Sequence, residues 1–328
     1  MEYVGIQTQK SRNDFRSMLL LFMFPCLVTG MVYLFCLALA WLGLMDGTMA
    51  EEAAAEGSLW YHANSAFLQS VPYAFGGVLI WFVIAYFFNT LIIKASTGAK
   101  SLERKDGKRV YNLVENLCMS QGMKMPKINI IYDDSLNAFA SGINERTYTV
   151  TLSEGIIEKL DDEELEAVIA HELSHIRNHD VRLLIVSIVF VGVFSMVAQI
   201  AFRTALSSGA SSRKSENKGG MIIVLLLAAV VAAIGYLLAT LMRFAISRKR
   251  EYLADAGSAE MTKNPRALAS ALRKISADPD IEAVTREDVA QLFIQHPGEQ
   301  SAGFIGKLGG LFATHPPIEE RIRILEQF

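Results

Sequence analysis

The sequence predicts a mainly α fold, with four transmembrane helices and an α+β domain on the cytoplasmic side of the membrane. Hydrophobic residues make up 52% of the 328 positions, which is more than ordinary soluble domains contain. They are concentrated in four blocks without a charged residue. Outside these blocks, helix-type and strand-type patterns alternate with charged segments, which indicates a folded domain beside the membrane part.

Each apolar block is long enough to cross the hydrocarbon core of a bilayer as a helix, which takes about 20 residues. The blocks span residues 18–44, 71–93, 183–202 and 221–242. One such block is also compatible with a buried core helix, but four in one chain favour a membrane. The first block is too long for the apolar part of a signal peptide, and no clear cleavage site follows it. We therefore expect it to be an uncleaved anchor.

The distribution of lysine and arginine predicts the orientation, because these residues accumulate in cytoplasmic loops. Lys10, Arg12 and Arg16 precede the first block, and six basic residues follow the second within residues 94–109. The loop at residues 46–70 has neither lysine nor arginine. We therefore expect the N-terminus and the segment after residue 94 to be cytoplasmic, and the 46–70 loop to face outward.

These observations divide the chain into alternating membrane and cytoplasmic segments. We expect a cytoplasmic N-terminus (1–17), a transmembrane helix (18–44), an outward loop (45–70), a second transmembrane helix (71–93), the first part of a cytoplasmic domain (94–182), a transmembrane hairpin (183–242) and the second part of that domain (243–328). The connection at 203–220 carries four basic residues and one acidic residue, which favours a re-entrant or peripheral hairpin. The apolar lengths favour a spanning hairpin.

The segment His171-Glu172-Leu173-Ser174-His175 reads H-E-x-x-H inside a stretch of helical periodicity. Acidic residues 161–164 suit the first turn of that helix. Histidines at i and i+4 share one helix face and can hold one zinc ion, while Glu172 can take a proton from water at the metal. This arrangement is typical of a zinc peptidase. The alternative, a surface helix with two solvated histidines, fits poorly in a chain with six histidines.

A catalytic zinc site needs a third protein ligand and one open position. The three cysteines form no metal-binding pattern, so we expect histidine and carboxylate ligands. Glu251 is the candidate, and Asp255 four residues later could accept a hydrogen bond from a zinc-bound histidine. On spacing alone, a solvated charge pair explains Glu251 and Asp255 equally well. Since the third and fourth apolar blocks separate His175 from Glu251, an even number of crossings is required to bring them together.

The remaining elements are shorter. The pattern predicts helices at 108–120, 265–275 and 286–294, strands at 128–132 and 147–152, and a final helix after Pro316 and Pro317. Small residues at 136–142 indicate either an edge strand beside the cleft or an ordinary turn. The glycine-rich segment 298–313 is expected to be a flexible or interfacial connection.

Several motifs in a fixed order resemble one known family. Besides the N-terminal apolar pair, the chain contains N-A-F-A-S-G at 137–142, H-E-L-S-H at 171–175, E-Y-L-A-D at 251–255 and H-P-P-I-E-E-R at 315–321. This order is similar to that of the HtpX heat-shock membrane proteases, which are grouped with membrane zinc endopeptidases that include the CAAX prenyl proteases. The likeness covers nearly the whole chain. It implies a zincin-like catalytic domain in the bacterial inner membrane.

The resemblance also implies roles for individual residues. One Zn²⁺ per chain is expected on His171, His175 and Glu251. Asp255 is expected to support a zinc-bound histidine by accepting a hydrogen bond from its outer ring nitrogen. Asn137, Ala138 and Phe139 are expected beside the substrate cleft. His315 and Arg321 are candidates for contacts to substrate or transition state, although His315 alone reads as a surface residue before a helix. The expected partners are the lipid bilayer and misfolded or damaged membrane proteins.

Other functional classes are less compatible with the sequence. With a net charge of −3, the sequence predicts no basic surface for nucleic acid. It contains no glycine-rich phosphate-binding motif, so we expect no nucleotide partner. Homo-oligomerisation stays open. A proteolytically inactive scaffold or chaperone is the main alternative, but a structural zinc site is normally closed by four protein ligands. An intramembrane protease would need its motif inside an apolar span, whereas residues 171–180 lie in a charged segment.

Overall fold

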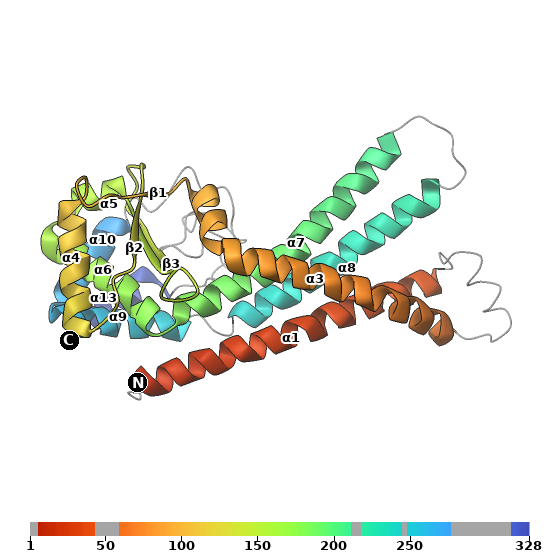
Figure 1. Cartoon of the computed structure of the whole chain (residues 1–328), viewed down its shortest axis with the longest axis horizontal. Coiled ribbons are helices and arrows are strands. Elements are labelled where there is room, and N and C mark those ends of the chain that lie inside the picture. The colour runs from red at the N-terminus through yellow and green to blue at the C-terminus, as the bar shows by residue number, and fades with distance from the viewer. Residues whose placement is uncertain (1–5, 43–58, 211–217, 245–247, 277–315, 328) are drawn as a thin grey trace. The chain divides into compact units, whose positions relative to one another are not determined.

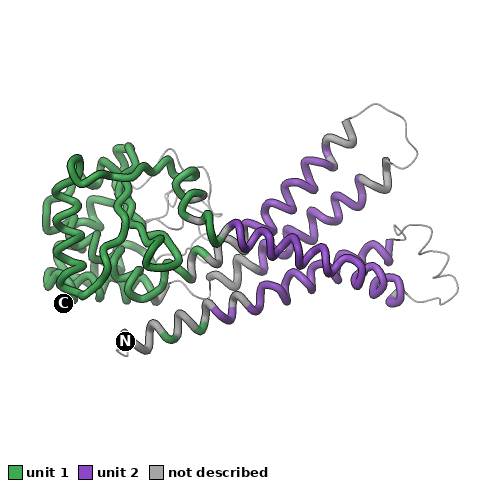
Figure 2. The backbone as a smooth tube through the Cα atoms, in the orientation of Figure 1, with its two compact units in different colours: residues 1–17, 86–188, 243–328 green, residues 18–85, 189–242 purple. Residues whose placement is uncertain are grey.

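The structure is a computed structural model of the full chain and describes residues 6–42, 59–210, 218–244, 248–276 and 316–327. The described residues fall into two compact units (Figures 1 and 2). Figure 2 shows the first unit, drawn from residues 1–17, 86–188 and 243–328, and the second, drawn from residues 18–85 and 189–242. The expected helix at 286–294 and the glycine-rich segment 298–313 lie outside the described residues.

The second unit consists of parts of long apolar helices. They are α1 (Ile6–Trp41), α3 (Leu59–Thr97), α7 (Asp180–Ala210) and α8 (Lys218–Phe244). Tyr33 on α1 donates a hydrogen bond of 3.1 Å to Asn64 Oδ1 on α3. The ring of Phe24 on α1 meets that of Phe194 on α7 edge-on, with centroids 5.7 Å apart. A hydrogen bond thus joins α1 to α3, and an aromatic contact joins α1 to α7.

Two of these helices are long and apolar enough to cross a membrane. The qualifying stretches are Phe22–Trp41 and Trp60–Phe88, and Ile222–Leu238 is a shorter apolar helix. Large apolar side chains are exposed on α3, including Tyr73 and Phe87, as is typical of helices that face lipid. The described residues therefore support a membrane protein with two candidate spans. The expected count of four spans stays a prediction.

A four-stranded mixed sheet lies in the first unit, in the order β1-β2-β4-β3. The strands are β1 (Lys100–Ser101), β2 (Lys127–Ile131), β3 (Ala138–Ser141) and β4 (Thr149–Ser153). β2 and β4 are parallel, whereas β1 and β3 pair antiparallel with their neighbours. The prediction of strands near 128–132 and 147–152 is confirmed. The ambiguous segment 136–142 contains an edge strand, β3.

Short helices lie beside this sheet in Figure 1. They are α4 (Lys108–Gln121), α5 (Glu154–Lys159), α6 (Asp162–Arg177), α9 (Arg248–Thr262), α10 (Pro265–Ile275) and α13 (Ile318–Leu325). The predictions of helices at 108–120, at 265–275 and after Pro317 are confirmed. A mostly helical chain with a small mixed sheet is therefore the observed fold, in agreement with the predicted class.

Helix α6 begins with a reciprocal cap. The Asp161 side chain accepts a hydrogen bond from the backbone N–H of Glu164, and the Glu164 carboxylate accepts one from the N–H of Asp161. The same buried carboxylate also accepts hydrogen bonds from Ser270 Oγ (2.7 Å) and Lys274 Nζ (2.6 Å) on α10. Because both partners lie on α10, the start of α6 is fixed to that helix.

Close packing fixes α6 against α9. A Cβ atom added to Gly257 on α9 would lie 2.1 Å from Ser174 Oγ and 2.9 Å from Ser174 Cβ. One residue later, Ser258 Oγ donates a hydrogen bond of 2.7 Å to the carbonyl oxygen of Ala167 on α6. A glycine and a buried serine thus allow the two backbones to approach closely, and this contact sets the spacing of the side chains between them.

Gly257→Val should destabilise the protein, because two methyl groups cannot fit between α9 and Ser174. Overpacking of this kind costs about 1–3 kcal/mol. Unfolding of the full chain in detergent, followed by helical circular dichroism, measures the effect. Ala259→Val, on a less buried position of the same helix, controls for β-branching. Equal unfolding midpoints for the two variants would show that α6 and α9 do not need the close approach.

Candidate metal centre

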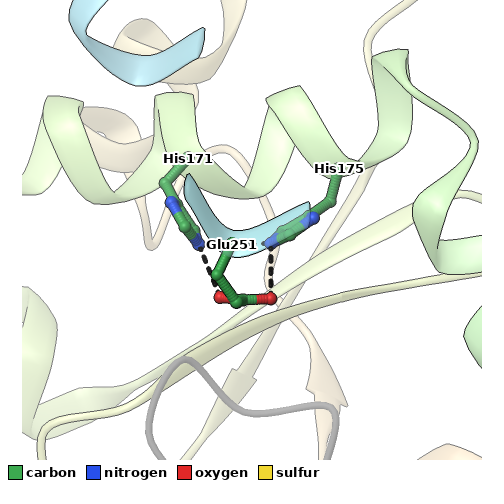
Figure 3. Close-up of side chains that lie close together, drawn as sticks. All are labelled: His171, His175 and Glu251. Carbon is green, nitrogen blue, oxygen red and sulfur yellow. Dashed lines mark hydrogen bonds and ion pairs between the residues drawn. The ribbon is translucent and has the colours of Figure 1, made fainter. Parts of the chain in front are cut away.

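Three side chains converge between α6 and α9. His171 and His175 point from one face of α6 toward Glu251 near the start of α9 (Figure 3). His171 Nε2 lies 3.2 Å from His175 Nε2 and 3.7 Å from Glu251 Oε2. His175 Nε2 lies 3.6 Å from Glu251 Oε1. The sequence-predicted ligand candidates are therefore brought together, although they come from segments far apart in the chain.

These separations fit one small metal ion. Zinc binds histidine nitrogen and carboxylate oxygen at about 2.0–2.1 Å, so two ligand atoms of a tetrahedral site lie about 3.3 Å apart. The two imidazole nitrogens lie 3.2 Å apart, and each lies 3.6 or 3.7 Å from a different oxygen of the Glu251 carboxylate, which is close to that value. Two imidazoles and one carboxylate also form a donor set that suits zinc. The residues present thus fit the metal that their sequence pattern predicts.

Burial of the centre is uneven. His171 is 0% exposed and Glu251 is 6% exposed, whereas the side chain of His175 is 13% exposed. A cluster of two histidines and a carboxylate is costly to bury unless a cation or hydrogen bonds compensate the charge. The arrangement is therefore typical of a binding site rather than of a hydrophobic core.

Asp255 and Arg321 lie behind His171. Asp255 Oδ1 is 3.0 Å from His171 Nδ1, the ring nitrogen that faces away from Glu251. Arg321 donates two hydrogen bonds to the same carboxylate, from Nε (2.9 Å) and Nη2 (2.7 Å). Its Nη1 lies 3.8 Å from Glu251 Oε2. This bidentate pair holds the carboxylate that faces the imidazole, so the ring orientation of His171 is fixed from α13.

The charges of this group shift its proton affinities. Burial lowers the pKa of His171, but the hydrogen bonds to Asp255 and Glu251 outweigh it and raise the pKa to about 9. Burial would raise the pKa of Asp255, yet the guanidinium of Arg321 and the imidazole of His171 hold it below its usual range. Since Arg321 is 1% exposed, its charge acts on Asp255 through a medium that screens little.

Glu172 is buried beside the histidines at the edge of the sheet. Burial raises the pKa of its carboxyl group, while His171, His175 and the backbone N–H of Ala140 on β3 lower it and Glu251 raises it. The side chain is 2% exposed. A carboxyl group with a raised pKa, close to a metal-binding cluster, has the properties of a general base.

Asp180 is a contact that the sequence analysis missed. Its Oδ2 lies 3.2 Å from Nδ1 of His175, on the side of the ring that faces away from Glu251. His179, with φ of 60°, has a left-handed conformation that separates α6 from α7, and Asp180 follows it directly. An acidic residue five positions after the second histidine was the available signal.

The other predicted site residues lie at different places. Ala138 and Phe139 begin edge strand β3, Asn137 directly precedes it, and all three residues are buried. Arg321 contacts Asp255 rather than an open surface, and its substrate role stays a prediction. His315 lies outside the described residues. The roles expected for Asn137, Ala138 and Phe139 at the substrate also stay predictions.

Comparison with known proteins places these observations in a family. The profile of Peptidase family M48 matches residues 104–328, which include both histidines of α6 and Glu251. A "Protease HtpX homolog" of Bacteroides fragilis is 68% identical over 328 residues, covering 100% of both chains. A protein of the same name from Lactobacillus helveticus is 37% identical over 77% of this chain and 85% of its own.

Two further matches extend this comparison. A "Protease HtpX homolog" of Dictyoglomus thermophilum is 38% identical over 76% of this chain and 81% of its own. The crystal structure of S. mikatae Ste24p aligns with a TM-score of 0.48 and 19% identity, covering 88% of this chain and 66% of that one. From the M48 profile and the full-length likeness to HtpX homologs, we conclude that the chain belongs to peptidase family M48.

Proposed function

We propose that this chain is a membrane zinc endopeptidase with Glu172 as its general base. The observation that carries the proposal is the set of three donors, His171, His175 and Glu251, whose separations fit one zinc ion. Membership of a peptidase family supports the reaction class. Misfolded or damaged membrane proteins are the proposed substrates, as the resemblance to HtpX proteases implies.

A zinc ion held by the three donors would supply positive charge that lowers the pKa of water toward neutral pH and polarises a peptide carbonyl. Glu172 takes the proton that the attacking water loses and delivers it to the leaving amine. The Glu172 carboxylate lies next to both histidines and accepts a hydrogen bond from Ala140. These contacts hold it close to the proposed position of the attacking water. The proposed role of His315 is to donate a hydrogen bond to the oxyanion.

Substrate binding is proposed along edge strand β3. The carbonyl oxygen of Asn137 accepts a hydrogen bond from Ser153 on β4, so by alternation Ala138 and Ala140 direct their backbone groups to the opposite edge. The N–H of Ala140 bonds to Glu172 at that edge. An extended peptide added there would place its backbone beside the base, which supports the substrate role proposed for residues 137–139.

Glu172→Gln should lower the rate of peptide cleavage by about 10²–10⁴-fold, because an amide cannot accept the proton. Metal content should stay unchanged, since the side chain is not among the three donors. Cleavage of an unfolded membrane protein by the purified chain, without ATP, measures the effect. Glu166→Gln, on the same helix and partly exposed, is the matched control. Wild-type turnover by the Glu172 variant would exclude this residue as the base.

Glu251→Ala should weaken zinc binding and abolish cleavage, because only two protein donors remain. Elemental analysis of the purified chain should give one zinc per wild-type molecule and much less for the variant. Glu260→Ala, at an exposed position of α9, should keep both properties. A wild-type chain that holds zinc but cleaves nothing under any condition would instead support the scaffold alternative.

We propose an inner-membrane location with the N-terminus and the catalytic residues in the cytoplasm. An impermeant thiol reagent tests it on intact spheroplasts, in a variant whose three cysteines are replaced by alanine. Cysteines introduced at Ser58 and Ser212 should react, since both positions fall in connections expected outside. A cysteine at exposed Ser120 should react only after lysis. Protection of the Ser212 position alone would favour a re-entrant hairpin.

A further inference from the structure

We propose that Asp180 is a positioning residue that fixes the ring of His175 for metal binding. The inference rests on the proposed metal site and extends it to a carboxylate outside the three donors. Asp180 Oδ2 lies 3.2 Å from His175 Nδ1, while His175 Nε2 lies on the side of Glu251 and His171. Asp180 is 2% exposed, so its contact with the imidazole is shielded from water.

The chemistry of imidazole explains why a carboxylate suits this position. A neutral imidazole carries its proton on one nitrogen and offers a lone pair on the other. An ionised carboxylate only accepts hydrogen bonds, so Asp180 favours the tautomer with the proton on Nδ1. Nε2 then carries the lone pair that faces the other two donors. A side-chain amide at the same place could donate to Nδ1 and stabilise the tautomer that cannot bind metal through Nε2.

The backbone holds Asp180 in place through a tight turn and an arginine. The N–H of Asn178 bonds to the Ser174 carbonyl (2.9 Å), and His179 then takes a left-handed conformation that ends α6. Arg250 Nη1 donates a hydrogen bond of 3.2 Å to the backbone carbonyl of Asp180. Arg250 directly precedes Glu251, so the turn is tied to the helix that carries the third donor.

A purely structural explanation covers only part of these contacts. Asp180 is the first residue of α7, where an acidic side chain is favoured by the helix dipole. That preference explains an aspartate at the start of a helix but not its approach to Nδ1 of His175. Asp255 makes the corresponding contact to Nδ1 of His171 from α9. Each imidazole thus faces one carboxylate with its outer nitrogen and the common centre with its inner one.

The test measures metal affinity directly on the full chain in detergent, after the metal has been stripped. Competition against a chelator gives the Zn²⁺ affinity, and Co²⁺ substitution gives an absorption spectrum that reports ligand geometry. We expect Asp180→Asn to weaken Zn²⁺ binding by about 10–100-fold and to change the Co²⁺ spectrum. Asp134→Asn, at an exposed position, should match the wild type. Thermal stability of the metal-free chain should change little in either variant.

A second variant separates positioning from folding. Arg250→Met should weaken Zn²⁺ binding in the same direction, and the double variant with Asp180→Asn should lose less than both losses combined, because one residue acts through the other. Wild-type affinity and an unchanged Co²⁺ spectrum in Asp180→Asn would overturn the proposal. An equal loss of stability with and without metal would also overturn it, in favour of a structural role. Failure of the wild type to bind Zn²⁺ would instead refute the proposed metal site.

Discussion

The candidate metal centre depends on one constraint: two imidazoles and one carboxylate must lie close enough together to share a single coordination sphere. Helix geometry alone places His171 and His175 on one face of α6. The carboxylate of Glu251 arrives from α9, whose distance from α6 is set by the absence of a side chain at Gly257 and by the Ser258 hydrogen bond to Ala167. The other contacts described around the site hold these two helices, or these three side chains, in their relative positions.

Buried charged residues on the far side of the two histidines help to hold the donors in position. Arg321 reaches Asp255 from the last described helix, and Arg250 reaches the backbone of Asp180. Both arginines are buried. Each bonds to an aspartate whose carboxylate faces one of the two histidine rings. A buried ion pair such as Arg321–Asp255 is costly to desolvate, so these arginine contacts are poorly explained as sources of stability alone. Their geometry instead restricts how the histidines can turn.

The sequence predicted those parts of the fold and site that depend on local spacing. The i, i+4 histidines, the acidic first turn of α6 and the strands with β-branched residues follow rules that act within one element. Glu251 remained ambiguous on spacing alone, because its partners come from a distant helix and only packing of α6 on α9 brings them together. Asp180 was missed since a left-handed residue, His179, redirects the chain. The contact of Arg321 with Asp255 depends on the packing of α13, which spacing along the chain does not reveal, and the substrate role expected for Arg321 stays a prediction.

The separation of the donors along the chain also has a consequence for biosynthesis. A ribosome makes His171, Glu172 and His175 first, then the whole apolar hairpin, and only afterwards Glu251 and the arginine near the C-terminus. A nascent chain that still lacks Glu251 therefore has two of the three donors and lacks the carboxylate that completes the set. The three donors of the candidate metal centre can come together only late in translation, after the hairpin has been synthesised.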